Sequence, residues 1–171
     1  MRKIVLGLGG NVGDVKSNLN QVINALQEKF SYPITKSSFY KTKAWGNTNQ
    51  PDFFNLVVYF DSELDLKSTF EITREIEREG GRIRNPNIKW GPRTIDIDIL
   101  FYGNTVVSSL DLTIPHPQIQ NRNFVLYPMA EILPNFVHPT LNKSIAELLK
   151  TSIDNLKVER NWSSQNHHIT L

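Results

Sequence analysis

The pattern of apolar and polar positions along the chain predicts an order of strand, helix, two strands, helix and strand. Strands are expected over residues 3–8, 34–43, 52–62 and 95–99, which are apolar runs or alternate with period two. Helices are expected after Asp14 and Asp65, since each is a suitable N-cap before apolar residues at helical spacing. Tyr32-Pro33 ends the first helix, and Gly80-Gly81 ends the second.

The remainder of the chain has weaker patterns. Residues 105–107 follow a turn at Gly103-Asn104 and are expected to form a hairpin with strand 95–99. Short helices are expected over residues 125–132 and 144–149. The order β-α-β-β-α-β is that of the ferredoxin-like, or split βαβ, fold, an α+β arrangement with an antiparallel sheet and helices on one face. We therefore expect one domain over residues 1–156 with a C-terminal helical extension, and a polar tail over residues 157–171.

Composition narrows the class of protein. The 171 residues are 39% hydrophobic and 21% charged, which is typical of a globular protein with one sizeable core. A net charge of only +2 argues against a dedicated nucleic-acid binder. The absence of cysteine excludes disulfides and thiolate chemistry and fits the cytoplasm. The apolar runs are too short for a signal peptide or a membrane helix, so we expect no membrane association.

Two aspartates on one strand are the strongest chemical signal. In residues 95–99, the three isoleucines point to one face, and Asp96 and Asp98 point to the other, about 7 Å apart. Two neighbouring carboxylates repel each other, and a divalent cation such as Mg²⁺ bound with substrate phosphates would compensate this repulsion. The alternative is a solvated strand face that carries two aspartates. The cations of the preceding loop, among them Arg82 and Arg93, favour a metal–phosphate complex.

Other candidate positions have two interpretations each. The glycine-rich residues 7–13 do not match a dinucleotide fingerprint, because its third glycine would fall at Val12, and they predict a flexible turn instead. Asn55 lies within an apolar strand and either ties two backbone segments together or recognises a ligand edge. His116 stands between two prolines and is either a surface residue or a phosphate contact. The pair His167-His168 lacks acidic or cysteine neighbours, which argues against a metal site there.

The residues around the two aspartates resemble a known family. Residues 90–99 read Trp-Gly-Pro-Arg-Thr-Ile-Asp-Ile-Asp-Ile, which is similar to the signature of 6-hydroxymethyl-7,8-dihydropterin pyrophosphokinase, an enzyme of folate biosynthesis. Further similar segments are residues 37–42, 50–55, 81–84, 115–116 and 121–124, and the resemblance extends over residues 3–150. It implies the ferredoxin-like fold and transfer of the pyrophosphoryl group of ATP to the pterin hydroxymethyl oxygen, with release of AMP.

The resemblance also implies roles for individual residues. Asp96 and Asp98 would hold two Mg²⁺ ions, and Arg82 and Arg93 would stabilise developing charge, which makes these four the catalytic group. ATP would be bound by Glu77, Arg84, Trp90, Arg93, Ile99, Thr113, His116 and Arg122. The pterin would be bound by Thr42, Lys43, Trp45, Phe53, Asn55, Trp90 and Phe124. The loop 82–94 would close over the substrates with Trp90 as a lid, and the protein is expected to act as a monomer.

The sequence departs from the family pattern at four positions. Gly10 stands where a serine is usual, Pro117 where an aromatic is frequent, Asp111 where an arginine sometimes occurs, and Phe53 where many members have tyrosine. Asp111 and Pro117 bear on nucleotide affinity rather than on the reaction.

Two other functions are compatible with parts of the pattern. A non-catalytic ferredoxin-like nucleotide-binding module would explain the basic loop and the aromatics, but it does not need paired aspartates. A two-metal phosphodiester hydrolase would use the same aspartates with water as the nucleophile, so that AMP would form from ATP without a pterin.

Overall fold

An antiparallel sheet organises the molecule. The structure is a computed structural model that describes residues 1–44, 48–82 and 91–161. Within these residues the main sheet has the strand order β5-β1-β4-β3-β8, and the short strand β2 also pairs with β4. The strands are β1 (Arg2–Gly10), β2 (Thr35–Lys36), β3 (Phe39–Thr42), β4 (Phe53–Ser62), β5 (Asp96–Tyr102) and β8 (Val158–Asn161). Strands β2 and β3 together correspond to one predicted strand. With them counted as one, β1 to β5 and the two helices between them follow the predicted ferredoxin-like order.

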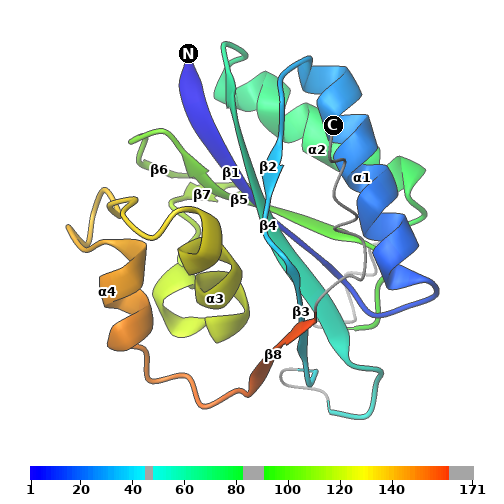
Figure 1. The fold of residues 1–171 in the computed structure, drawn as a ribbon. Helices are drawn as coiled ribbons and strands as arrows, with labels where there is room; N and C mark the ends of the chain where they lie inside the picture. The colour runs from blue at the N-terminus through cyan, green and yellow to red at the C-terminus, as the bar shows by residue number, and fades with distance from the viewer. Residues whose placement is uncertain (45–47, 83–90, 162–171) are drawn as a thin grey trace, which may run out of the picture.

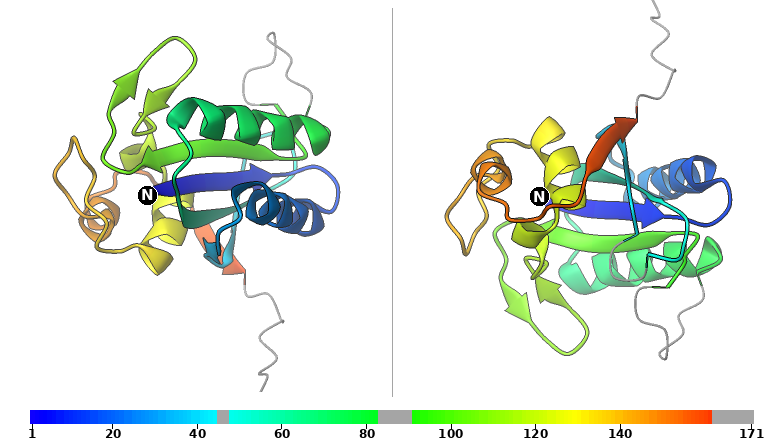
Figure 2. Two further views of the ribbon diagram at one scale, coloured as in Figure 1. Left: turned by 90° about the horizontal axis from the view of Figure 1, so that it is seen from above. Right: turned by 90° about the horizontal axis from the view of Figure 1, so that it is seen from below.

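Helices cover both faces of this sheet. Helices α1 (Val15–Phe30) and α2 (Leu66–Glu79) lie on one face, and α3 (Asn123–Ile132) and α4 (Ile145–Lys150) lie on the other (Figure 1, Figure 2). The prediction of helices on one face was therefore incomplete. The predicted C-terminal helices are present, and they close the second face because Val5, Val57 and Leu100 point toward them from the sheet. None of the helices in the described ranges is long and apolar enough to span a membrane.

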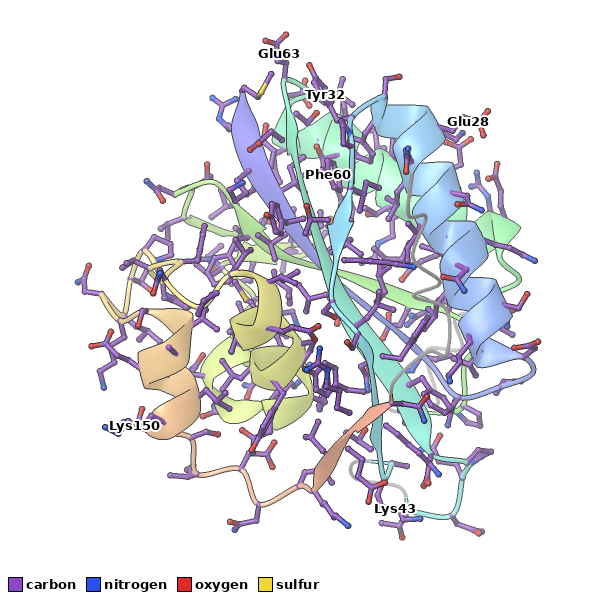
Figure 3. The ribbon with its side chains drawn as sticks, in the orientation of Figure 1. Glu28, Tyr32, Lys43, Phe60, Glu63 and Lys150 are labelled. Atoms are coloured by element: carbon purple, nitrogen blue, oxygen red, sulfur yellow. The ribbon has the colours of Figure 1, made fainter. Side chains whose placement is uncertain are left out.

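Two cores follow from this arrangement. Alternate residues of β1 pack in the first core, under α1 and α2, where Phe60 of β4 contacts Phe30 of α1 with ring centroids 4.6 Å apart (Figure 3). The second core lies between the sheet and helices α3 and α4.

The predicted helix starts are confirmed. Asp14 accepts a hydrogen bond from the backbone N–H of Ser17 at 3.2 Å, and Asp65 accepts one from Ser68 at 2.7 Å.

A β-bulge at Leu100 of β5 changes which residues of the strand face each of the two cores. The predicted alternation is confirmed for Ile97 and Ile99, which are buried in the core under α1 and α2. The pairing with β1 then shifts by one residue at Leu100, so that Leu6 is opposite Ile99 and Val5 is opposite Phe101. Because the extra residue reverses the alternation, Phe101 packs in the second core, against α3 and α4.

The predicted strand over residues 34–43 is interrupted. It divides into β2 and β3 at Ser37, whose hydroxyl accepts a 3.0 Å hydrogen bond from the backbone N–H of Val57. The side chain takes a place that a backbone carbonyl would have in a regular ladder.

Two other predictions were wrong: the hairpin between residues 105–107 and strand 95–99, and the loose tail after residue 156. The strand β6 (Val107–Ser108) pairs with β7 (Thr113–Ile114) and not with β5, and this hairpin projects from the body of the molecule (Figure 2). Beyond β7, a 3₁₀ helix (Ile119–Asn121) leads into α3. The polar residues 158–161 are not a loose tail, because they form the edge strand β8 on β3. An edge strand needs backbone pairing more than apolar side chains, so a polar sequence suffices there.

Candidate active site

A cavity of about 260 Å³ lies on the sheet face that α3 covers, beside the first turn of that helix. Its floor includes Gly7 and Gly9 of β1, and its sides come from β3, β4, β5 and α3. The predicted site residues on its wall are Thr42, Lys43, Phe53, Asn55, Arg82, Arg93, Asp96, Asp98, His116, Arg122 and Phe124. The fold thus brings together residues that are up to 82 positions apart in the chain. Trp45, Arg84 and Trp90, together with most of the proposed lid loop, lie outside the described residues.

Two arginines bind the first aspartate of β5. Arg82 Nη1 contacts Asp96 Oδ1, and Arg93 Nη1 donates to Asp96 Oδ2 at 2.8 Å. Both carboxylate oxygens are therefore paired with guanidinium groups, whose planar shape also matches phosphate oxygens. The side chains of Arg82 and Arg93 are only 12% and 23% exposed, so this pairing takes place in a partly desolvated site.

The second aspartate has no such direct pairing among the residues that the structure describes. Burial and, second to it, the neighbouring Asp96 charge raise the pKa of Asp98 to about 6. A carboxylate in this position gains more from a nearby cation than an exposed one would.

The two carboxylates fit a hard divalent cation with an incomplete protein shell. Over residues 1–44, 48–82 and 91–161, the structure contains no group of three or more histidine, cysteine or acidic side chains that could hold a metal. Mg²⁺ is typically bound by one or two carboxylates and takes its other ligands from phosphate and water. Asp96 and Asp98, which share one face of β5, offer that donor set.

Glu77 of α2 supports these residues from behind. Its side chain is only 2% exposed, and it is absent from the walls of the described cavities. Its carboxylate accepts hydrogen bonds from the backbone N–H of Ile97 at 2.8 Å, from Arg74 at 2.9 Å and from Arg82 at 3.3 Å. Burial raises the pKa of Glu77 to about 7 despite these donors. In this geometry Glu77 holds Arg82 and the acidic strand in place.

Arg93 is fixed through its backbone. Asn11 accepts a 2.9 Å hydrogen bond from the N–H of Arg93 and donates its own backbone N–H to the Arg93 carbonyl, also at 2.9 Å. The amide of Asn11 also donates to Gln50 and to the carbonyl of Pro51 at 3.0 and 3.1 Å. The Arg93 guanidinium lies over the ring of Phe53 at 5.4 Å, and within the described residues its buried Nε has no hydrogen-bond partner. The end of β1 thereby sets the position of this arginine.

The part of the cavity away from the aspartates and arginines combines aromatic rings and an amide. Phe53 and Asn55 of β4 and Phe124 of α3 all line it. The Asn55 amide donates to the hydroxyl of Thr42 at 3.4 Å, and a Cβ atom on Gly9 would approach Asn55 Oδ1 to 2.5 Å, so only glycine leaves room for it. Lys43 lies at the rim after the end of β3, where it pairs with Asp52 at 3.1 Å (Figure 3). A flat ligand with polar edges suits this part of the cavity.

A second cavity of about 250 Å³ adjoins the first and shares Arg74, Asp98 and His116 with it. Ile99 and Thr113, two predicted site residues, line it, as do the divergent Asp111 and Pro117. Burial and, second to it, the Arg122 charge lower the pKa of His116 to about 4. Its Nδ1 accepts from the backbone N–H of Gln118 at 3.2 Å, which leaves Nε2 as a neutral donor.

Sequence reasoning missed Arg74 as a site residue. It lines both cavities and pairs with Glu77 three residues later in α2. The signal was present, because residues three apart share one helix face and Glu77 was already a candidate.

These features define a class: an α+β protein of ferredoxin-like topology whose cavity joins paired carboxylates and arginines to an aromatic pocket. The sequence model of the 7,8-dihydro-6-hydroxymethylpterin-pyrophosphokinase (HPPK) family matches residues 5–134. The chain belongs to this family.

Relatives in three bacteria support the assignment, and each is described as a 2-amino-4-hydroxy-6-hydroxymethyldihydropteridine pyrophosphokinase. The Synechocystis protein is 42% identical over 147 residues, which are 85% of this chain and 74% of the relative. The Aquifex aeolicus protein is 40% identical over 86% of this chain and 90% of its own length. The Haemophilus influenzae protein is 36% identical over 91% of this chain and 96% of its own length.

The fold is also found in solved structures. The crystal structure of Plasmodium falciparum HPPK-DHPS wild type with SDX-DHP superposes with a TM-score of 0.66 at 17% identity. The match covers 88% of this chain and 43% of the Plasmodium chain, so the present chain corresponds to less than half of that protein. At this identity the likeness supports the fold alone.

Proposed function

We propose that this protein transfers the pyrophosphoryl group of ATP to 6-hydroxymethyl-7,8-dihydropterin and releases AMP, as a step of tetrahydrofolate biosynthesis. One observation carries the proposal: a single cavity joins Asp96, Asp98, Arg82 and Arg93 to a pocket lined by Phe53, Asn55 and Phe124. The first group suits a polyphosphate, and the second suits a flat heterocycle with polar edges. Family membership and the names of the bacterial relatives support the same reaction.

In the proposed reaction the pterin hydroxymethyl oxygen attacks the β-phosphorus of ATP. The bond between the β-phosphorus and the α,β-bridging oxygen breaks, AMP leaves with that oxygen, and the hydroxyl proton passes to water. There is little covalent chemistry for the protein to perform, so its contribution is positioning and electrostatic stabilisation. Arg82 and Arg93 would stabilise the negative charge that develops on the phosphoryl oxygens.

Asp96 and Asp98 would hold two Mg²⁺ ions together with the triphosphate. The metal, when bound, neutralises phosphate charge and polarises the phosphoryl group. In the structure Asp96 is paired with two arginines, so we expect these guanidinium groups to turn toward phosphate oxygens when ATP and metal enter.

The other residues divide between the two substrates. For ATP, we assign Ile99 and Thr113 to the wall of the second cavity, and Arg122 and the neutral Nε2–H of His116 to phosphate contacts. We assign Glu77 to the support of Arg82 rather than to direct contact with the nucleotide. Arg84 and Trp90 remain predictions for ATP.

For the pterin, Phe53 and Phe124 would stack on its two faces, and Asn55, held by Thr42, would bind its edge. Lys43 lies at the rim of this pocket. Trp45 and Trp90 remain predictions for the pterin. The cytoplasmic location and the monomeric state also remain predictions from the sequence.

The test is AMP release from MgATP with and without 6-hydroxymethyl-7,8-dihydropterin. We expect AMP only when the pterin is present, in equal amounts with the pterin pyrophosphate. AMP without pterin would identify a phosphodiester hydrolase. Absence of AMP in both reactions, with ATP still bound independently of Mg²⁺, would identify a non-catalytic nucleotide-binding module.

A further inference from the structure

The start of α3 forms part of the cavity wall, and its cap comes from a distant part of the chain. Arg122 and Phe124 line the cavity and flank Asn123, the first residue of the helix. Arg122 provides no side-chain cap. Instead, Asp154 Oδ2 accepts a 2.7 Å hydrogen bond from the backbone N–H of Asn123, and the Asn123 amide donates to the Asp154 carbonyl at 2.8 Å.

Asp154 is itself held in one orientation. Its other carboxylate oxygen accepts from the backbone N–H of Leu156 at 2.9 Å, and its own N–H donates to the hydroxyl of Ser152 at 3.3 Å. Asn123 is buried and Asp154 is half-buried, so the contact is partly shielded from water. A fixed carboxylate at a helix N-terminus satisfies an otherwise unpaired N–H and interacts favourably with the helix dipole.

The same segment also reaches the opposite wall of the cavity. Four residues after Asp154, Val158 begins β8 and pairs with Thr42 of β3, the partner of Asn55. Four residues of extended chain span at most about 14 Å. Residues 154–158 therefore limit the separation between the start of α3 and the end of β3. They belong to the segment that runs below α3 from α4 to β8 in Figure 1.

A second set of contacts joins the other end of α3 to strands β8 and β3. Glu131, on the last turn of α3, accepts from Arg160 of β8 at 2.7 Å and from the Tyr40 hydroxyl of β3 at 2.8 Å. Both ends of α3 are thus bonded to the C-terminal segment, one through Asp154 and the other through Arg160. This arrangement makes the position of α3 depend on residues that touch neither cavity.

We propose that Asp154 is a positioning residue for the transfer reaction. By capping α3 from the C-terminal segment, it fixes Phe124 and Arg122 at the distance from Thr42 and Asn55 that a flat ligand requires. The inference rests on the proposed function in taking that ligand to be the pterin.

The first experiment compares Asp154→Ala, Asp154→Asn and Glu159→Ala in the full chain. Glu159 is the matched control, because it is an acidic residue of the same segment whose carboxylate pairs with Lys157 rather than with α3. For Asp154→Ala we expect the pterin Kd to rise about tenfold, because a cap stabilises the start of a helix by an amount on this scale and ligand binding would then have to restore that order. The MgATP Kd, to which this turn contributes only Arg122, should rise by a smaller factor. Asp154→Asn keeps one acceptor and should restore part of the affinity, and Glu159→Ala should match the wild type.

A double-mutant cycle tests whether Asp154 acts through the stacking residue. In a Phe124→Ala background, Asp154→Ala should change the pterin Kd by less than about twofold, because the ring that it positions is gone. An equal change in both backgrounds, or equal losses of pterin and ATP affinity, would overturn the positioning role.

Amide hydrogen exchange separates this inference from the proposed function. The N–H groups of Asn123 and Val125 should exchange faster in Asp154→Ala than in Glu159→Ala, with protection of β1 and β4 unchanged. If the wild type does not use the pterin but this exchange result holds, the proposed function fails and the capping role stands. If exchange at α3 is unchanged, the capping role fails whatever the reaction.

Discussion

The buried carboxylate of Glu77 accepts a 2.8 Å hydrogen bond from the backbone N–H of Ile97, the residue between the two aspartates of β5. The same carboxylate pairs with Arg82, which in turn contacts Asp96. One side chain of α2 therefore fixes both the acidic strand and one of its guanidinium partners. The face that carries Asp96 and Asp98 is held from the opposite side of the sheet.

Replacement of Glu77 tests this supporting role. Glu77→Ala leaves the buried N–H of Ile97 without its acceptor and removes one partner each from Arg74 and Arg82, so the free energy of unfolding should fall by about 3 kcal/mol. Glu77→Gln should cost less, because its amide oxygen can still accept from Ile97. Urea unfolding measures both values. Loss of ATP affinity in Glu77→Gln with unchanged stability would contradict the supporting role and favour direct contact with the nucleotide.

Replacement of Asp98 should have opposite effects on stability and on turnover. Asp98→Asn should reduce kcat at least about 100-fold, because a metal–phosphate ligand is lost. Thermal stability of the metal-free protein should rise, since burial and the Asp96 charge both disfavour the Asp98 carboxylate. The measurements are AMP release and thermal unfolding in EDTA. Asp61→Asn, which removes a surface partner of Lys3, is the control and should change kcat less than about twofold. Retained turnover in Asp98→Asn would refute the metal assignment.

The sequence predicted the acidic face well because alternation is a local property. Strict period two over residues 95–99 places the isoleucines and aspartates on opposite faces, as the structure confirms. The bulge at Leu100 has no such local signal, so the reversal that brings Phe101 into the second core could not be predicted.

Long-range contacts account for the other differences. Glu77 reads as an exposed helix charge, and only the packing of α2 on β5 buries it. The contact between Asp154 and Asn123 joins residues 31 positions apart, and the pairing of β8 with β3 joins residues still further apart. The polar sequence around both contacts gives no periodic pattern from which to infer them.

Gly10 stands where the resemblance noted in the sequence led us to expect serine, and the structure leaves little room for a side chain there. A Cβ atom on Gly10 would lie 2.4 Å from the carbonyl oxygen of Thr94, which is backbone and cannot rotate away. Gly10→Ser should therefore push the segment at Thr94 outward and displace the neighbouring Arg93. We expect a loss of about 1–3 kcal/mol in stability and a lower kcat.

Gly7→Ala is the matched control for Gly10→Ser, because the added methyl group would meet only Leu100 at an ordinary 3.5 Å. Its stability should stay within about 1 kcal/mol of the wild type. Urea unfolding measures both variants, and AMP release measures Gly10→Ser. Equal stability of Gly10→Ser and the wild type would show that the backbone at Thr94 yields easily.

His138 should make stability fall at mildly acidic pH. It is buried beside Phe101, with ring centroids 5.2 Å apart, and its Nδ1 accepts from the N–H groups of Thr140 and Leu141 at 3.3 Å each. Burial lowers the pKa of His138 below its usual value near 6.5. The unfolded chain therefore binds a proton at this position before the folded protein does. Stability is fully present above about pH 6.5 and declines as the pH falls toward the folded pKa.

His138→Asn isolates this contribution, because an asparagine oxygen can replace Nδ1 as the acceptor and does not titrate. The free energy of unfolding, measured in urea at pH 7 and pH 5, should fall less in the variant than in the wild type. His116, whose pKa is also lowered, is present in both proteins, so its contribution cancels in the difference. Equal declines in the two proteins would mean that His138 is protonated as readily in the folded state as in the unfolded chain.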